Sequence, residues 1–176
     1  MSNPQVLDCG PVFQMTVDIL LRRHAKIHVA DLVTVMLHDE SKFWDRHGKV
    51  AVFRNDIFLE QFPEIPAGSV SAVFGWHLLD LVPREMHQDL VDRWFSYLQP
   101  GGGLFCLLRE PRLGTGSDTS WWLESLTTLG SGHDGRRPFS CPAITNREME
   151  KLVSEGSVKT FLTRSGRREV LAIKQG

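Results

Sequence analysis

The chain has 176 residues and a formal net charge of −1, with 41% hydrophobic and 23% charged residues. This length suits one domain with one sizeable core, and the balanced charge argues against a general electrostatic grip on nucleic acid or an anionic membrane. No stretch approaches the roughly 20 apolar residues that a membrane-spanning helix needs.

The cysteines indicate the compartment. Cys9, Cys106 and Cys141 show no CxxC or paired spacing, and two of them lie in predicted strands, where free cysteine behaves as a small buried hydrophobe. This is typical of a reducing compartment. We therefore expect a soluble cytoplasmic protein.

The first segments alternate between strand and helix patterns. A short apolar run over 6–9 is closed by a turn at Gly10-Pro11, and apolar side chains then recur at helical spacing from 13 to 24. A second strand over 26–31 ends in an acid. Strand, helix and strand in this order predict a parallel pair with a right-handed crossover.

The following segments predict a third strand and a loop. A helix is expected over 32–38, and a polar connection over 39–49 leads to a third strand at 50–53. Pro63 and Pro66 exclude a regular helix in the segment that follows.

A second unit of strand, helix and strand occupies the middle of the chain. An apolar strand lies within 69–77, a helix opens at Pro83, and a Pro100-Gly101-Gly102 turn leads into a strand over 104–108. The apolar residues of this helix form one stripe that should face the core: Met86, Leu90, Val91, Trp94, Phe95 and Leu98.

The last part contains an irregular insertion and a regular end. Residues 112–142 are rich in Gly, Ser and Thr, and a long irregular insertion is usually functional or disordered. A capping box at Thr145 and Glu148 then begins a helix. Strands over 158–163 and 169–174 are expected to form a hairpin.

The order and punctuation of these segments resemble the class I S-adenosylmethionine-dependent methyltransferases. In that family a GSxDxV strand, an LLxLxP helix start and an LxPGGxL strand start follow one another, as do 69–77, the helix at Pro83 and 98–104 here. The resemblance implies an α/β, Rossmann-like three-layer sandwich. It further implies a seven-stranded, mostly parallel sheet with a C-terminal antiparallel hairpin, in a single domain over 1–176.

The resemblance also implies sites for S-adenosylmethionine and a small-molecule substrate at the carboxyl ends of the strands. The cofactor would contact its loop acid and first glycine, its ribose acid, its adenine site and the end of the fourth strand. These positions correspond to Asp8, Gly10, Asp31, Leu32, Asp56, Ile57, Gly75 and Trp76. Alternatively, Asp31 caps the next helix, and Asn55-Asp56 starts a turn.

Two departures from the family pattern leave the function open. Val12 and Gln14 replace the next two loop glycines, and their side chains would occupy space that the cofactor uses. Val12 and Phe13 are alternatively expected to begin a helix and pack into the core. The chain also begins at its first strand, without the N-terminal helices that usually cover the cofactor. The hypotheses are a methyltransferase acting on a small molecule, and a non-catalytic module for binding or assembly.

Other chemistry rests on a few aromatic and imidazole groups. His77 would lie near the transferable methyl as a general base, or act as a capping or packing residue. Trp121 and Trp122 would form a lid over a substrate, or pack against the body or a second subunit in a homodimer. The histidine and cysteine spacings do not indicate a metal site. Partners among nucleic acids or membranes are not expected.

Overall fold

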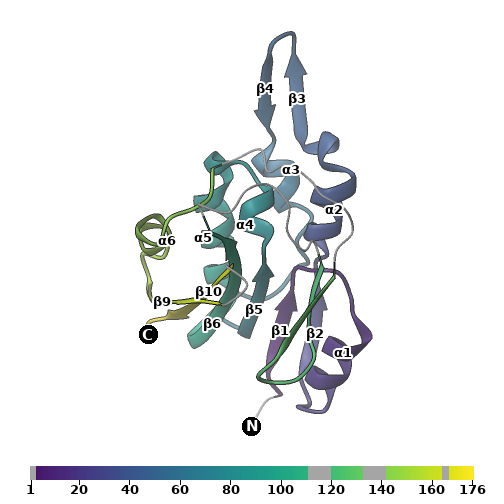
Figure 1. The fold of residues 1–176 in the computed structure, drawn as a ribbon, viewed down its shortest axis with the longest axis vertical. Helices are drawn as coiled ribbons and strands as arrows, with labels where there is room; N and C mark the ends of the chain where they lie inside the picture. Colours follow the sequence, from purple (N-terminus) through teal and green to yellow (C-terminus); the bar gives the residue numbers. More distant parts are fainter. Residues whose placement is uncertain (1–2, 111–119, 133–141, 164–166) are drawn as a thin grey trace.

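The structure of the protein is a computed structural model that describes residues 3–110, 120–132, 142–163 and 167–176. A six-stranded sheet in the order β2-β1-β5-β6-β10-β9 forms its centre (Figure 1). Neighbours among β2, β1, β5 and β6 pair in parallel, and β10 is antiparallel to both β6 and β9. The strands are β1 (Gln5–Asp8), β2 (Lys26–Val29), β5 (Val70–Trp76), β6 (Leu98–Arg109), β9 (Gly156–Leu162) and β10 (Arg167–Lys174).

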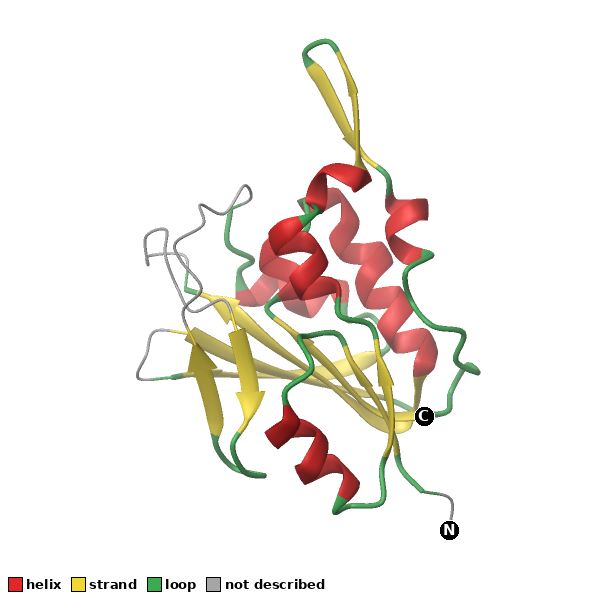
Figure 2. Ribbon diagram, turned by 90° about the vertical axis from the view of Figure 1, so that its right-hand side faces the viewer, coloured by secondary structure: helices red, strands yellow, loops and turns green. Residues whose placement is uncertain are grey.

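Helices lie on both sides of this sheet, as predicted. Figure 2 shows α1 on one side and most of the other helices on the opposite side. The helices are α1 (Gln14–Leu21), α2 (Leu32–His38), α3 (Asn55–Leu59), α4 (Leu78–Leu81), α5 (His87–Tyr97) and α6 (Asn146–Leu152), with short 3-10 turns at Glu40–Phe43 and Arg84–Met86.

The apolar patterns explain how the elements pack. Every residue of the stripe predicted for the helix after Pro83 is buried, which fixes α5 on the sheet. The capping box at α6 forms as predicted, with Thr145 and Glu148 bonding each other's backbone N–H groups. The antiparallel direction of the C-terminal strand is also confirmed, although its hairpin turn lies outside the described residues.

The predicted third strand does not join the central sheet. Instead, β4 (Val50–Phe53) pairs antiparallel with β3 (Trp44–His47) in a hairpin that projects from the body (Figures 1 and 2). Gly48 has a φ of 62°, a left-handed conformation that lets glycine begin a two-residue turn without steric penalty. The described sheet therefore has six strands rather than seven, and β2 is one of its edges.

The region predicted as an irregular insertion contains a second hairpin. Here β7 (Ser120–Leu123) pairs with β8 (Leu129–Gly132), while most of the remaining insertion lies outside the described residues. The Leu123 N–H donates to the Thr16 hydroxyl at 3.0 Å, which ties the hairpin to α1.

Gly75 in β5 provides a test of packing between the sheet and α5. A Cβ at Gly75 would lie 2.8 Å from Cη2 of Trp94 and 2.9 Å from Sγ of Cys106. We expect Gly75→Ala to lower the free energy of unfolding by roughly 1–3 kcal/mol, because the core has no room for the methyl group. Urea denaturation measures this change.

Gly103→Ala in β6 is the matched control. Its Cβ would meet its nearest neighbour, Cδ1 of Ile173, at an ordinary 3.4 Å, so we expect a much smaller change. Equal stability of the two variants would contradict the close approach of α5 to β5.

Candidate functional site

The carboxyl ends of β1 and β5 meet at a buried hydrogen-bond pair. The Asp8 carboxylate ends β1, and its Oδ1 accepts from Nε1 of Trp76 at 2.7 Å and from the Gly10 N–H at 3.0 Å. Asp8 therefore holds both the turn after β1 and the indole at the end of β5.

Trp76 fills the space beside the loop glycine. A Cβ built on Gly10 would lie 2.5 Å from Cδ1 of Trp76, and the tryptophan is only 1% exposed. Its ring stacks on Phe74 with centroids 5.5 Å apart and meets Phe105 edge-on at 6.1 Å. The indole thus lies against Asp8 and Gly10, two positions at which the resemblance implies cofactor contacts.

Trp76 adopts an unusual backbone conformation at this point. Its φ is 47°, in the left-handed region that bulky residues rarely enter. Such a conformation persists only where surrounding contacts fix it, and the bond to Asp8 and the two phenylalanine rings are among the contacts that do so.

Burial changes the acidity of Asp8. Desolvation raises its pKa to about 6, although the hydrogen bonds from Trp76 and Gly10 act in the opposite direction. The protonated form is therefore more easily reached here than at an exposed aspartate.

Asp31 and Leu32 connect α2 to the same edge. Asp31 is the N-cap of α2, where its Oδ1 accepts from the Thr34 N–H at 3.0 Å, so the capping alternative is present in the structure. Leu32 is buried, and its N–H lies 3.2 Å from the Cys9 carbonyl oxygen. A ribose contact at Asp31 stays a prediction.

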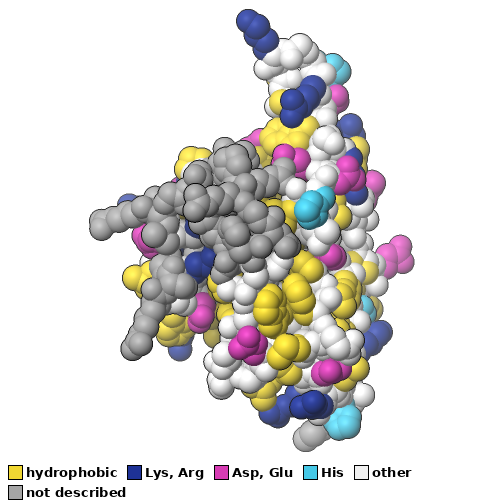
Figure 3. Space-filling view, turned by 45° about the vertical axis from the view of Figure 1, so that its right-hand side comes forward, with side chains coloured by type: hydrophobic (Ala, Val, Ile, Leu, Met, Phe, Trp, Pro, Cys, Tyr) yellow, Lys and Arg dark blue, Asp and Glu magenta, His cyan; other side chains and the backbone are white. Residues whose placement is uncertain are grey.

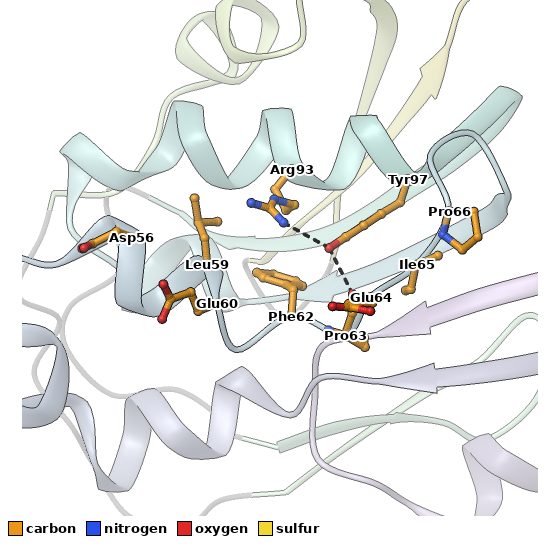
Figure 4. Close-up of a pocket in the computed structure, with 10 residues that line it drawn as sticks. All are labelled: Asp56, Leu59, Glu60, Phe62, Pro63, Glu64, Ile65, Pro66, Arg93 and Tyr97. Atoms are coloured by element: carbon orange, nitrogen blue, oxygen red, sulfur yellow. Dashed lines mark hydrogen bonds between the residues drawn. The ribbon is translucent and has the colours of Figure 1, made fainter.

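Asp56 and Ile57 lie in the first turn of α3. The exposed Asp56 carboxylate pairs with Arg54 at 3.0 Å, and this bond lowers the pKa of Asp56. Figure 4 shows Asp56 at one end of a groove built from α3, the loop after it and α5. The residues that line this groove include neither Asp8 nor Trp76.

The two residues expected to obstruct the loop face solvent. Val12 is 58% exposed, and the exposed Gln14 side chain donates to Asp18 on its own helix at 2.7 Å. The expectation that Val12 packs into the core is wrong because the helix begins only after it. Phe13 packs instead on Trp122, with centroids 4.9 Å apart.

Gly75 and His77 are both packed against other residues at the end of β5, Gly75 against Trp94 and Cys106. His77 is 1% exposed at the N-cap of α4, and burial together with Arg167 lowers its pKa to about 3. Neither ring nitrogen has a hydrogen-bond partner among the described residues. An imidazole with this pKa is a weak proton acceptor at neutral pH.

The two tryptophans of the insertion have different environments. Trp121 is buried with the Arg167 guanidinium 5.0 Å from its ring centroid, whereas Trp122 is half-buried against Phe13. Both contacts hold the β7–β8 hairpin to the body, which favours the packing alternative over a lid.

The described ranges show neither a group of three or more potential metal-ligating side chains nor a helix that could cross a membrane. That the protein holds no metal stays a prediction from the sequence.

Comparisons with solved structures show the fold of S-adenosylmethionine-dependent methyltransferases. One such enzyme from Mesorhizobium loti matches with a TM-score of 0.54 and 11% identity, over 98% of this chain and 91% of that chain. Another, from Archaeoglobus fulgidus, matches with a TM-score of 0.51 and 12% identity, over 97% and 86% of the two chains.

A third similar structure contains ligands. The 1,6-didemethyltoxoflavin-N1-methyltransferase of Burkholderia thailandensis, with bound 1,6-didemethyltoxoflavin and S-adenosylhomocysteine, matches with a TM-score of 0.51 and 14% identity, over 99% of this chain and 72% of that chain. No protein-family model and no curated protein matches the sequence.

Asp8→Asn tests the electrostatics of the site. The pKa of Asp8 is higher in the folded protein than its ordinary 3.8, so the folded state binds this proton more tightly. The contribution of Asp8 to stability therefore falls as pH rises from 3.8 to about 6 and stays low at higher pH. Asparagine keeps an acceptor without the buried charge, and we expect it to raise the free energy of unfolding at pH 7.5 by roughly 1–3 kcal/mol.

Denaturant titrations at several pH values measure this effect. In Asp8→Asn, the dependence of the free energy of unfolding on pH between pH 4 and pH 6 should weaken only in part. Asp80 also contributes to it, because burial raises the pKa of Asp80 to about 6. Asp31→Asn is the matched control, since asparagine is an equally good helix cap. A lower stability of Asp8→Asn at pH 7.5 would contradict the destabilising charge.

Proposed function

We propose that this chain is a non-catalytic module with the methyltransferase fold, which binds or assembles with a partner and does not hold S-adenosylmethionine at its glycine loop. The observation that carries this proposal is the position of the Trp76 indole beside Gly10, fixed by the bond to Asp8.

The turn at Gly10 does not fit the cofactor. The backbone at Gly10 is the part a ligand would approach, and Trp76 already lies against it. Asp31 is engaged as a helix cap, and Asp56 pairs with Arg54 on the groove surface. The indole therefore lies against the group that would hold the methionine part, while the helix cap at Asp31 uses only one of its two carboxylate oxygens.

Energetics favour the closed arrangement. Moving the indole into water would break a hydrogen bond to a charged group, about 1.5–3 kcal/mol, and expose most of a tryptophan, about 4–6 kcal/mol. Relief of the strained backbone would return about 1–3 kcal/mol. The remaining several kcal/mol would weaken any ligand that needs the open form by two or more orders of magnitude.

The second candidate is an S-adenosylmethionine-dependent methyltransferase acting on a small molecule. The φ of 47° at Trp76 favours it, because a strained residue is a ready point of conformational change. Methyl transfer needs chiefly placement of the reactants and exclusion of water, so the weak basicity of His77 does not count against it.

Calorimetric titration with S-adenosylmethionine and S-adenosylhomocysteine separates the two candidates. We expect no binding by the wild type at millimolar ligand, weaker than about 4 kcal/mol. Trp76→Gly removes the indole and suits the positive φ, so it should gain measurable affinity. Adding Asp31→Ala to that variant should then lower the affinity at least tenfold, by loss of a charged acceptor.

Trp122→Gly is the control, because it removes a tryptophan that does not contact Gly10. It should stay without affinity. Thermal melting must show each variant folded, since removing a buried tryptophan lowers stability by about 3–5 kcal/mol. Micromolar binding by the wild type would overturn the module proposal and support the enzyme.

A further inference from the structure

The β3–β4 hairpin forms an arm that is anchored at its base. Its base is held by aromatic contacts: Phe53 lies 5.6 Å from Phe58, 5.9 Å from Phe43 and 5.1 Å from Trp44, measured between ring centroids. Phe43, Phe53 and Phe58 are buried. The arm projects away from the body, as both ribbon views show (Figures 1 and 2).

The outer end of the arm is basic and partly apolar. Arg46 and Lys49 are exposed there, and the Asp45 carboxylate lies 3.2 Å from Nε2 of His47. Figure 3 shows Lys or Arg and His side chains gathered on the projecting hairpin. Val50 and Val52, on one face of β4, are 62% and 53% exposed.

The groove between α3 and α5 has the complementary character. This open groove has a volume of about 800 Å³, and three of its lining residues are the acids Asp56, Glu60 and Glu64, against one cation, Arg93. The described part of the chain offers Glu60 and Glu64 no salt bridge, whereas Asp56 pairs with Arg54.

The floor of the groove is buried, and one of its walls is held by hydrogen bonds. Phe62 and Ile65 are buried beneath it, and Figure 4 shows Phe62 near its middle. Tyr97 donates to the Pro63 carbonyl oxygen at 3.3 Å and accepts from Arg93 at 3.5 Å, so the wall from α5 is tied to the loop after α3 (Figure 4). The groove thus combines an apolar floor with an acidic rim.

We propose that the basic end of the β3–β4 arm of one copy docks in this acidic groove of a second copy, which returns the same contact. The arm cannot enter its own groove, because α3 begins directly after β4 and the aromatic base directs the arm away from it. A reciprocal contact is the twofold arrangement that most homodimers use.

The charges of the two surfaces are complementary. Arg46 and Lys49 would meet Glu60 and Glu64, whereas Val50 and Val52 lie on the opposite face of the hairpin from Arg46, together with Asp45 and His47. Each dimer contains two such contacts, so each charge acts twice. This proposal goes beyond the proposed function and is independent of whether a cofactor binds.

Sedimentation equilibrium of the full chain over a concentration series, without S-adenosylmethionine, tests the proposal. We expect a dimer whose dissociation constant rises with salt, since exposed charges are screened. The arm variant, Arg46→Glu with Lys49→Glu, and the groove variant, Glu60→Lys with Glu64→Lys, should each raise that constant at least tenfold. An equimolar mixture of the two variants should form a dimer again, because both contacts are then between opposite charges.

The matched control is Arg22→Glu with Arg23→Glu, which makes the same change in net charge at exposed residues after α1. It should dimerise like the wild type. A wild type that stays monomeric would overturn the proposal, and the occupant of the groove would then be a different basic protein. A dimer that both charge reversals leave intact, or that mixing fails to restore, would also overturn it and indicate another interface.

Discussion

The hydrogen bond from the Trp76 indole to the Asp8 carboxylate is the constraint on which this edge of the sheet depends. It joins the ends of β1 and β5, orders the turn at Gly10, and holds Trp76 in a backbone conformation that its own side chain disfavours. It also keeps a carboxylate in a dry environment, where the charge is opposed by burial and supported only by two N–H donors. One side chain, the Trp76 indole, therefore fills the space beside Gly10 at this edge.

The parts of the fold predicted from the sequence are those with strong local signals. The stripe from Met86 to Leu98 repeats at helical spacing and is buried, and the capping box at Thr145 needs only residues three apart. The antiparallel end of the sheet followed from the resemblance and is confirmed by the pairing of β10 with β6 and β9. In each case, the local pattern and the tertiary environment favour the same structure.

The parts that could not be predicted depend on partners distant in sequence or on an unexpected pairing. Val50–Phe53 has a strand pattern but no local sign of which strand it joins. Its partner β3 is mostly polar, so the sequence does not indicate β3 as a strand. Gly48 between the two segments was the available signal of a hairpin. Trp76 was predicted as a cofactor contact at the end of the fourth strand, and nothing near it in the chain indicates Gly10 and Asp8 as its neighbours. The acidic groove likewise gathers side chains from α3 and α5 that no motif connects.

The redirection of β4 into the arm leaves β2 as an outer strand, and this bears on the solubility of the folded chain. An outer strand presents backbone groups that can template pairing with other chains, the usual start of aggregation. Here the exposure is blunted by composition: β2 has four residues, and Lys26 and His28 alternate with Ile27 and the partly exposed Val29. Short length and a lysine are common protections of such edges. A longer or more apolar β2 would become an aggregation site unless another strand covered it.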